Sequence, residues 1–169
     1  DAAMMQPEVI LDAPEFGRVL WLLGRRGVEL GLSSGTVRCF NIPLDVKSGS
    51  RAVPDPSRPG ELFLLENGSS RLWRLSFGDS AQAEELTSAH EAARFKTSLG
   101  SRLVLCGLGA SSLLVSGTPG PGAHTPWLFD LKAQTWTRLP AAPHPILSSA
   151  VVAEKDTVTI IGGWSKQRS

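Results

Sequence analysis

Short runs of apolar residues, separated by glycine, proline and other turn formers, follow one another along most of the chain. Val19–Leu23 ends at Gly24, and Val28–Leu32 and Thr36–Ile42 come next. The later runs are Glu61–Leu65, Arg71–Phe77, Arg102–Cys106, Ser112–Ser116, Trp127–Leu131, Thr135–Leu139, Ser148–Ala153 and Thr157–Ile161. Apolar runs of about four to eight residues bounded by such breakers are typical of buried β-strands. The pattern therefore predicts many short strands.

The segments between these runs carry turn and loop signals. Asn67-Gly68 lies between two apolar runs and predicts a hairpin turn, because this residue pair is favoured in tight turns. Residues 43–60 hold several prolines, which lack an N–H for a sheet ladder, and predict a surface loop. Residues 117–124 contain three glycines and two prolines and predict a second loop.

Two segments depart from the strand pattern. Residues 1–16 mix apolar and acidic side chains around two prolines, and we interpret them as an N-terminal arm or an edge strand. Residues 79–95 are compatible with a helix or a surface insert, since apolar side chains recur there at helical spacing. With at most one helix among many strands, the chain is predicted to be all-β: a sandwich, a barrel or a propeller.

An internal repeat narrows this choice. Residues 72–109 and 127–164 show the same order: an aromatic strand, a polar turn, a second strand ending in leucine, a crossing, a serine-bearing strand and an apolar strand closed by glycine. The closing glycines Gly107 and Gly162 lie 55 residues apart. Repeats of about 40 to 50 residues are the sequence signature of propeller blades.

The last third of the chain resembles a kelch repeat. Phe129 and Trp136 are seven residues apart, and an apolar strand ends at the pair Gly162-Gly163. The resemblance implies a β-propeller in which the tryptophan packs within a blade and the paired glycines let neighbouring strands approach closely. It predicts that residues 127–164 form one four-stranded blade, with a second blade over residues 72–109.

Chain length limits the number of blades. Kelch-type repeats run about 50 residues, so 169 residues hold about four blades' worth of sequence. We expect residues 17–169 to form a partial or small kelch-like propeller after the segment 1–16. Three arrangements stay open: an unusually small propeller, a fragment of a longer chain, or a partial propeller completed by another chain.

The charge balance argues against a nucleic-acid or membrane partner. The chain has 17 Lys and Arg against 16 Asp and Glu, a net charge of +1, and no apolar run of membrane-spanning length. Arg25-Arg26 with Arg18, and Arg71 with Arg74, are candidate basic patches, with tryptophans nearby. Since single-stranded nucleic-acid binders combine aromatic platforms with a basic footprint, the near-zero net charge disfavours that function.

Residues able to carry catalysis or hold a metal are sparse. His90, His124 and His144 are far apart in sequence, without the spacing of metal ligands. Cys39 and Cys106 are the only cysteines and are predicted to be buried free thiols, which with the lack of a leader sequence favours an intracellular location. The sequence therefore predicts no metal, no cofactor and no enzymatic activity.

The kelch resemblance implies a protein–protein interaction scaffold, such as an adaptor or substrate-recognition module. Loops on a rigid scaffold carry recognition, so segments 43–60 and 117–126 are the predicted binding rims. Arginine and tryptophan are enriched at interface hot spots. The candidate binding residues are Arg51, Arg58, His124 and Trp127. Two alternatives are an accessory propeller of an enzyme whose catalytic part lies outside this chain, and a structural subunit of a large assembly.

Overall fold

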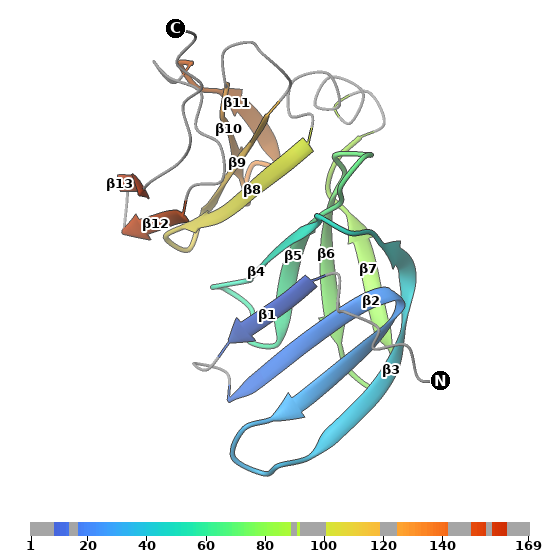
Figure 1. Cartoon of the computed structure of the whole chain (residues 1–169). Helices are drawn as coiled ribbons and strands as arrows, with labels where there is room; N and C mark the ends of the chain where they lie inside the picture. The colour runs from blue at the N-terminus through green and yellow to red at the C-terminus, as the bar shows by residue number, and fades with distance from the viewer. Residues whose placement is uncertain are drawn as a thin grey trace, which may run out of the picture.

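The chain folds into antiparallel β-sheets (Figure 1). A computed structural model describes residues 9–13, 17–88, 91, 101–118, 125–141, 150–154 and 157–161. Within these residues the all-β prediction is confirmed. No helix in the described ranges has the length and hydrophobicity to span a membrane.

The strands form four meanders, in which each strand pairs with the next along the chain. The first sheet contains β1 (Val9–Ala13), β2 (Arg18–Gly31) and β3 (Val37–Val46). The second contains β4 (Arg51–Pro54), β5 (Glu61–Leu65), β6 (Leu72–Phe77) and β7 (Ala81–Glu85). The third contains β8 (Ser101–Leu108), β9 (Ser112–Thr118), β10 (Trp127–Asp130) and β11 (Thr135–Arg138). The fourth pairs β12 (Ala150–Glu154) with β13 (Thr157–Ile161).

The first three sheets stack face to face through two apolar clusters. Strand β5 explains how: its four apolar residues are all buried, and alternate side chains point to opposite faces of a strand. Leu62 and Leu64 join the cluster toward the first sheet, with Leu20, Leu22, Ile42, Val46 and Leu75. Phe63 and Leu65 join the cluster toward the third sheet, with Leu72, Leu103, Leu105, Leu113, Val115, Trp127 and Phe129. The second sheet is therefore covered on both faces.

The first strands of successive sheets lie next to one another. Strand β1 contacts β4, β4 contacts β8, and β8 contacts β12 (Figure 1). Strands β4, β8 and β12 begin at Arg51, Ser101 and Ala150, so their starts are 50 and 49 residues apart. The Arg51 guanidinium links two of these strands, since its Nε donates to the Leu103 carbonyl oxygen at 3.0 Å. The chain therefore repeats one sheet unit about every 50 residues.

The predicted blade boundaries are wrong. Strands β10 and β11 belong to one sheet with β8 and β9, whereas β12 and β13 pair with each other. The described strands within residues 127–164 thus divide between two sheets, and within residues 72–109 strands β6 and β7 belong to one sheet whereas β8 belongs to the next. Gly107 lies within β8, which pairs with β9 in the same sheet, so this glycine does not mark a change of sheet, and Gly162 lies outside the described residues. Between β11 and β12 the sequence carries Pro140, Pro143 and Pro145, which cannot donate to a ladder.

Several predicted element boundaries also need correction. Gly24 does not end a strand: with φ of +53° it lies within the long strand β2, at an irregularity of the β2–β3 ladder. Glycine adopts this backbone conformation readily and is common at bulges. Residues 43–60 are not all loop, because they include the end of β3 and the edge strand β4. Residues 81–85 form strand β7 and no helix, since they complete the ladder beside β6.

The turn predicted at Asn67-Gly68 is confirmed. The Glu66 and Ser70 amides close the turn between β5 and β6, donating to the carbonyl oxygens of Arg71 and Glu66 at 2.8 and 3.0 Å. Gly68 has φ of +85°, a region that favours glycine. Val9–Ala13 of the N-terminal segment form β1 at the edge of the first sheet.

Substitution of Gly27 is expected to destabilise the first sheet. Gly27 pairs with Phe40 across β2 and β3, and an added Cβ would overlap Cε2 and Cζ of that ring. The ring is held edge-on against Phe77 of β6, with centroids 5.2 Å apart. We expect Gly27→Ala to lower the free energy of unfolding by about 1–3 kcal/mol, measured by urea denaturation.

Gly107→Ala is the matched control. Gly107 also lies in a strand, but no heavy atom is within 4 Å of its added Cβ and its backbone is not left-handed. Its free energy of unfolding should stay within about 0.5 kcal/mol of the wild-type value. Equal losses in the two variants would contradict the close Gly27–Phe40 packing.

Candidate interaction surface

The predicted binding residues occupy different environments. Trp127 is not on a rim loop: it is the first residue of β10 and is 6% exposed, because it packs in the core between two sheets. Arg51 lies in β4, and its side chain is bound to backbone carbonyls of Leu103 and Ser50. Arg58 lies exposed in the β4–β5 turn, 3.5 Å from the Glu61 carboxylate. His124 is outside the described residues. The three described residues, Arg51, Arg58 and Trp127, therefore do not form one surface.

The aromatic pair of the repeat signature packs within one sheet. Phe129 and Trp136 are paired across β10 and β11, and their ring centroids are 4.5 Å apart. Phe129 is buried, while Trp136 is half-buried on the edge strand and packs against the same core cluster. Gly162 and Gly163 lie outside the described residues. The aromatic pair therefore helps to hold the outer strand of its sheet.

Most of the basic side chains named from the sequence are neutralised by carboxylates. Glu29 pairs with both Arg18 and Arg38, at 3.2 and 2.9 Å. Arg71 lies 3.5 Å from Glu85. The second predicted patch therefore does not form, and the first loses Arg18 to Glu29 and keeps only the pair Arg25-Arg26.

Arg74 lies at the centre of a cluster of three carboxylates. Its Nη1 donates to Glu84 at 2.9 Å, and its Nε lies 3.5 Å from Asp55 Oδ2 and 3.8 Å from Glu61 Oε2. Asp55 is 0% exposed. Its other oxygen accepts hydrogen bonds from the backbone N–H and the hydroxyl of Ser57. Because these carboxylates are engaged with Arg74, the cluster holds the β4–β5 turn on the sheet.

An open groove forms where the ladder between β2 and β3 is interrupted. Gly24 pairs with Val46 and Arg26 pairs with Asn41. Between these pairs β2 contributes only Arg25, whereas β3 contributes the residues 42–45. Pro43 within this stretch has no N–H and cannot continue the ladder. The groove has a volume of about 470 Å³ and is lined by Leu23, Gly24, Arg25, Arg26, Asp45, Val46, Lys47 and Ser48; we call it the basic groove.

One wall of the basic groove is fixed by the neighbouring sheet. The Asn67 side chain donates to the Ser48 carbonyl oxygen at 2.7 Å, and the Asn67 amide donates to Ser50 Oγ at 3.0 Å. Lys47 Nζ lies 3.4 Å from Glu66 Oε1. The turns β3–β4 and β5–β6 are thus tied together, which holds the groove in a defined shape.

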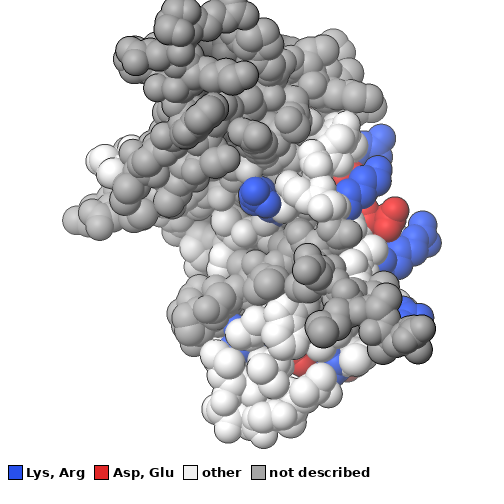
Figure 2. Space-filling model, in the orientation of Figure 1, with Lys and Arg blue, Asp and Glu red and all other residues white. Residues whose placement is uncertain are grey.

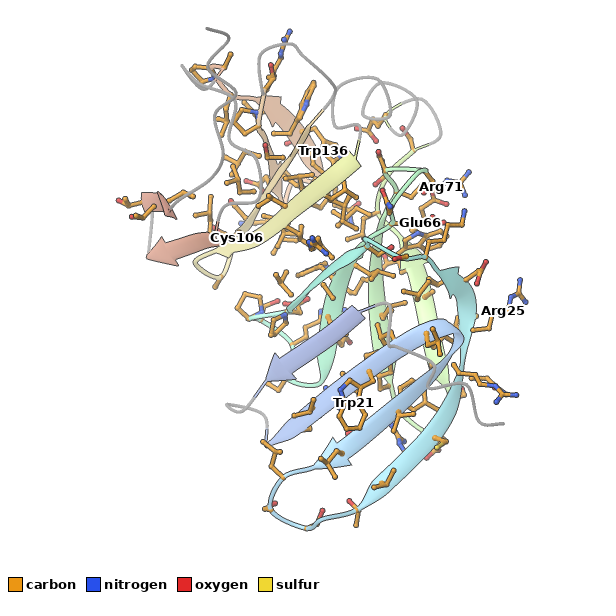
Figure 3. The ribbon with its side chains drawn as sticks, viewed as in Figure 1. Trp21, Arg25, Glu66, Arg71, Cys106 and Trp136 are labelled. Atoms are coloured by element: carbon orange, nitrogen blue, oxygen red, sulfur yellow. The ribbon has the colours of Figure 1, made fainter. Side chains whose placement is uncertain are left out.

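The guanidinium groups of Arg25 and Arg26 are the unusual feature of this groove. Both residues are exposed, and among the described residues neither has an ion-pair or hydrogen-bond partner for its side chain. Figure 2 shows Lys and Arg side chains gathered along one side of the molecule, with acidic atoms between them. Arg25 and Arg71 point outward on that side (Figure 3). The sequence shows the Arg25-Arg26 pair, but whether these charges remain free depends on the fold.

The prediction that both cysteines are buried needs correction. Neither cysteine is fully buried: Cys39 is exposed and Cys106 is half-buried, although both are free thiols. Cys39 lies on the face of β3 opposite to Phe40 and Ile42, which face the core. Burial raises the pKa of the Cys106 thiol, which favours the unreactive protonated form. Trp21 is half-buried, because it lies on the face of β2 opposite to the buried Leu20 and Leu22.

The described residues hold no group of three or more His, Cys, Asp or Glu side chains placed to bind a metal ion. The three histidines His90, His124 and His144 lie outside those residues. In comparisons with known proteins, no family model and no curated protein matches this chain.

Proposed function

We propose that this chain is part of a kelch-like β-propeller and acts as a non-catalytic scaffold for protein–protein interaction. The observation that carries the proposal is the succession of contacts between the first strands β1, β4, β8 and β12 of consecutive sheets. Radial stacking of four-stranded meanders around an axis is the architecture of propellers. The spacing of about 50 residues between equivalent strands also supports a propeller architecture.

The packing of the sheets and the exposed arginines also support a scaffold function. The second sheet is buried on both faces, so the stack is rigid and the turns at the strand ends are the parts free to differ in shape. Arg58 projects from one such turn, and the basic groove opens at the β3–β4 turn. Rigid elements that carry exposed arginines suit the recognition of another protein.

The proposal is tested by affinity capture with loop variants. In one variant residues 56–59 are replaced by Gly-Ser-Gly-Ser, which leaves Asp55 and Glu61 in place; in another, residues 119–124 are replaced in the same way. We expect a protein captured by the wild-type chain to be lost, at least tenfold by quantitative mass spectrometry, from one of these variants.

The control replaces Lys132 and Ala133 in the β10–β11 turn by glycine, and circular dichroism checks that every variant is folded. This turn is closed by backbone amides donating to Asp130 Oδ1, which glycine retains. Capture unaffected by either loop replacement would contradict recognition by these loops. Absence of any reproducible partner would contradict the scaffold function itself.

A further inference from the structure

We infer that the basic groove binds an extended acidic peptide segment of a partner protein, with Arg25 and Arg26 pairing its carboxylates. This inference deepens the proposed scaffold function and rests on it, since it names the chemistry of one partner. It starts from a contrast among the described basic residues. Arg18, Arg38, Lys47, Arg58, Arg71 and Arg74 all lie within 4 Å of a carboxylate of this chain.

Arg51 and Arg138 donate hydrogen bonds to other oxygen atoms, whereas Arg25 and Arg26 have neither a carboxylate nor a hydrogen-bond partner for their side chains among the described residues. They are adjacent in sequence at the point where the ladder is interrupted, and both residues line the same groove. A guanidinium group can donate two parallel hydrogen bonds to a carboxylate, and such charge-assisted bonds are stronger than neutral ones. Two arginines that have no partner among the described residues and line one groove therefore suit a ligand that carries carboxylates.

The remaining lining residues favour a peptide over a denser polyanion. Asp45 lies in the groove and Glu66 lies beside it, paired with Lys47. The negative charge of Asp45 would repel the closely spaced phosphates of a nucleic acid or of a lipid surface, while Glu66 offsets the positive charge of Lys47. A peptide avoids this conflict, because its carboxylates are spaced along the chain and its backbone N–H can face Asp45.

The lining of the groove and its ordered wall also suit a peptide. Half-buried Leu23 supplies apolar lining beside the charged residues. The wall from Asp45 to Ser48 is held by the Asn67 side chain, which donates to the Ser48 carbonyl oxygen. Binding to a wall that is already ordered costs less conformational entropy than binding to a mobile loop. Specificity would come from the spacing of carboxylates that matches the two arginines.

The test uses fluorescence anisotropy with a fluorescein-labelled peptide of alternating glycine and glutamate. The same peptide with glutamine at each glutamate position serves as the neutral probe. We expect the double variant Arg25→Gln/Arg26→Gln to bind the acidic peptide at least tenfold more weakly than the wild-type chain. We also expect the wild-type affinity to fall as ionic strength rises, because exposed charges are screened by salt.

Lys132→Gln is the matched control. Lys132 is exposed in the β10–β11 turn and, like the two arginines, has no side-chain partner among the described residues. Its loss removes one unpaired positive charge away from the groove, so peptide affinity should stay within twofold of the wild-type value. Urea denaturation of all variants confirms that any change in binding is not a loss of folding.

The results of these binding measurements either support or overturn the inference. Equal peptide affinities for the double variant and Lys132→Gln, or equal binding of the glutamate and glutamine peptides, would overturn it. The inference would also be overturned if a twelve-nucleotide oligo-dT, or anionic phospholipid vesicles, bound more tightly than the peptide and depended on the two arginines in the same way. If the chain captures a partner through its loops but does not bind the peptide, the proposed scaffold function is retained and only this inference is overturned.

Discussion

Truncation of Phe63 to alanine is expected to lower the free energy of unfolding by about 3–5 kcal/mol. Phe63 is 0% exposed and belongs to the cluster that joins the second and third sheets. Its ring is also covered by the Arg74 guanidinium, with Cζ 5.3 Å from the ring centroid. Removing the ring would leave a cavity between two sheets whose backbones are fixed by their own ladders, so collapse around the cavity is limited.

Urea denaturation followed by tryptophan fluorescence and circular dichroism measures this loss. Val37→Ala is the control, because Val37 is 64% exposed and its truncation should change stability by no more than about 0.5 kcal/mol. Phe63→Leu, which keeps most of the buried volume, should cost no more than about 1.5 kcal/mol and remains measurable if the alanine variant does not fold. A loss below about 1 kcal/mol in Phe63→Ala would contradict packing of the sheets through this ring.

Replacement of Arg74 by methionine is expected to cost about 3–5 kcal/mol, the range found when one partner of a buried ion pair is removed. Arg74 is the cation within 4 Å of Asp55 among the described residues, and the Asp55 side chain is 0% exposed. Methionine would keep much of the side-chain packing, but it would leave the Asp55 carboxylate buried without an opposing charge. Glu61 keeps Arg58 as a partner at 3.5 Å.

Two further variants separate this effect from simple loss of contacts. Asp55→Asn/Arg74→Met should be more stable than Arg74→Met alone, because asparagine removes the unpaired charge and keeps an Oδ1 acceptor for the Ser57 amide. Glu84→Gln should cost no more than about 1 kcal/mol, since the Glu84 side chain is 56% exposed. If Glu84→Gln costs as much as Arg74→Met, the buried Asp55 is not the residue that makes Arg74 important.

The positions of the strands were more predictable from the sequence than the neighbouring strands with which they pair. The apolar run Leu62–Leu65 indicated a buried strand, and the structure buries it on both faces. The repeat over residues 127–164 placed strands correctly at β10 and β11 but assigned them to the wrong sheet. A strand's apolar pattern shows that it is buried, but it does not specify which neighbour completes its ladder.

For the candidate surface, the sequence revealed which basic residues are present but not which of them meet carboxylates in the fold. Arg25-Arg26 is visible as a basic pair in the sequence, as are Arg71 and Arg74. In the fold Arg71 and Arg74 meet carboxylates of β7, whereas Arg25 and Arg26 meet none among the described residues. Trp127 looked suited to an interface, yet its position at the start of β10 places it in the core.

The amino-acid sequence by itself determined the all-β character and the turn at Asn67-Gly68, because strand alternation and turn chemistry are local properties of the chain. It also indicated a repeat, with 55 residues between Gly107 and Gly162, whereas the structure sets the spacing of equivalent strands at 50 and 49 residues. The tertiary structure decided which strands share a sheet, which faces are covered and which charges stay free. These depend on residues far apart in sequence, as in the hydrogen bond from Arg51 to Leu103 and the ion pair between Lys47 and Glu66. Such contacts form only when complete sheets stack.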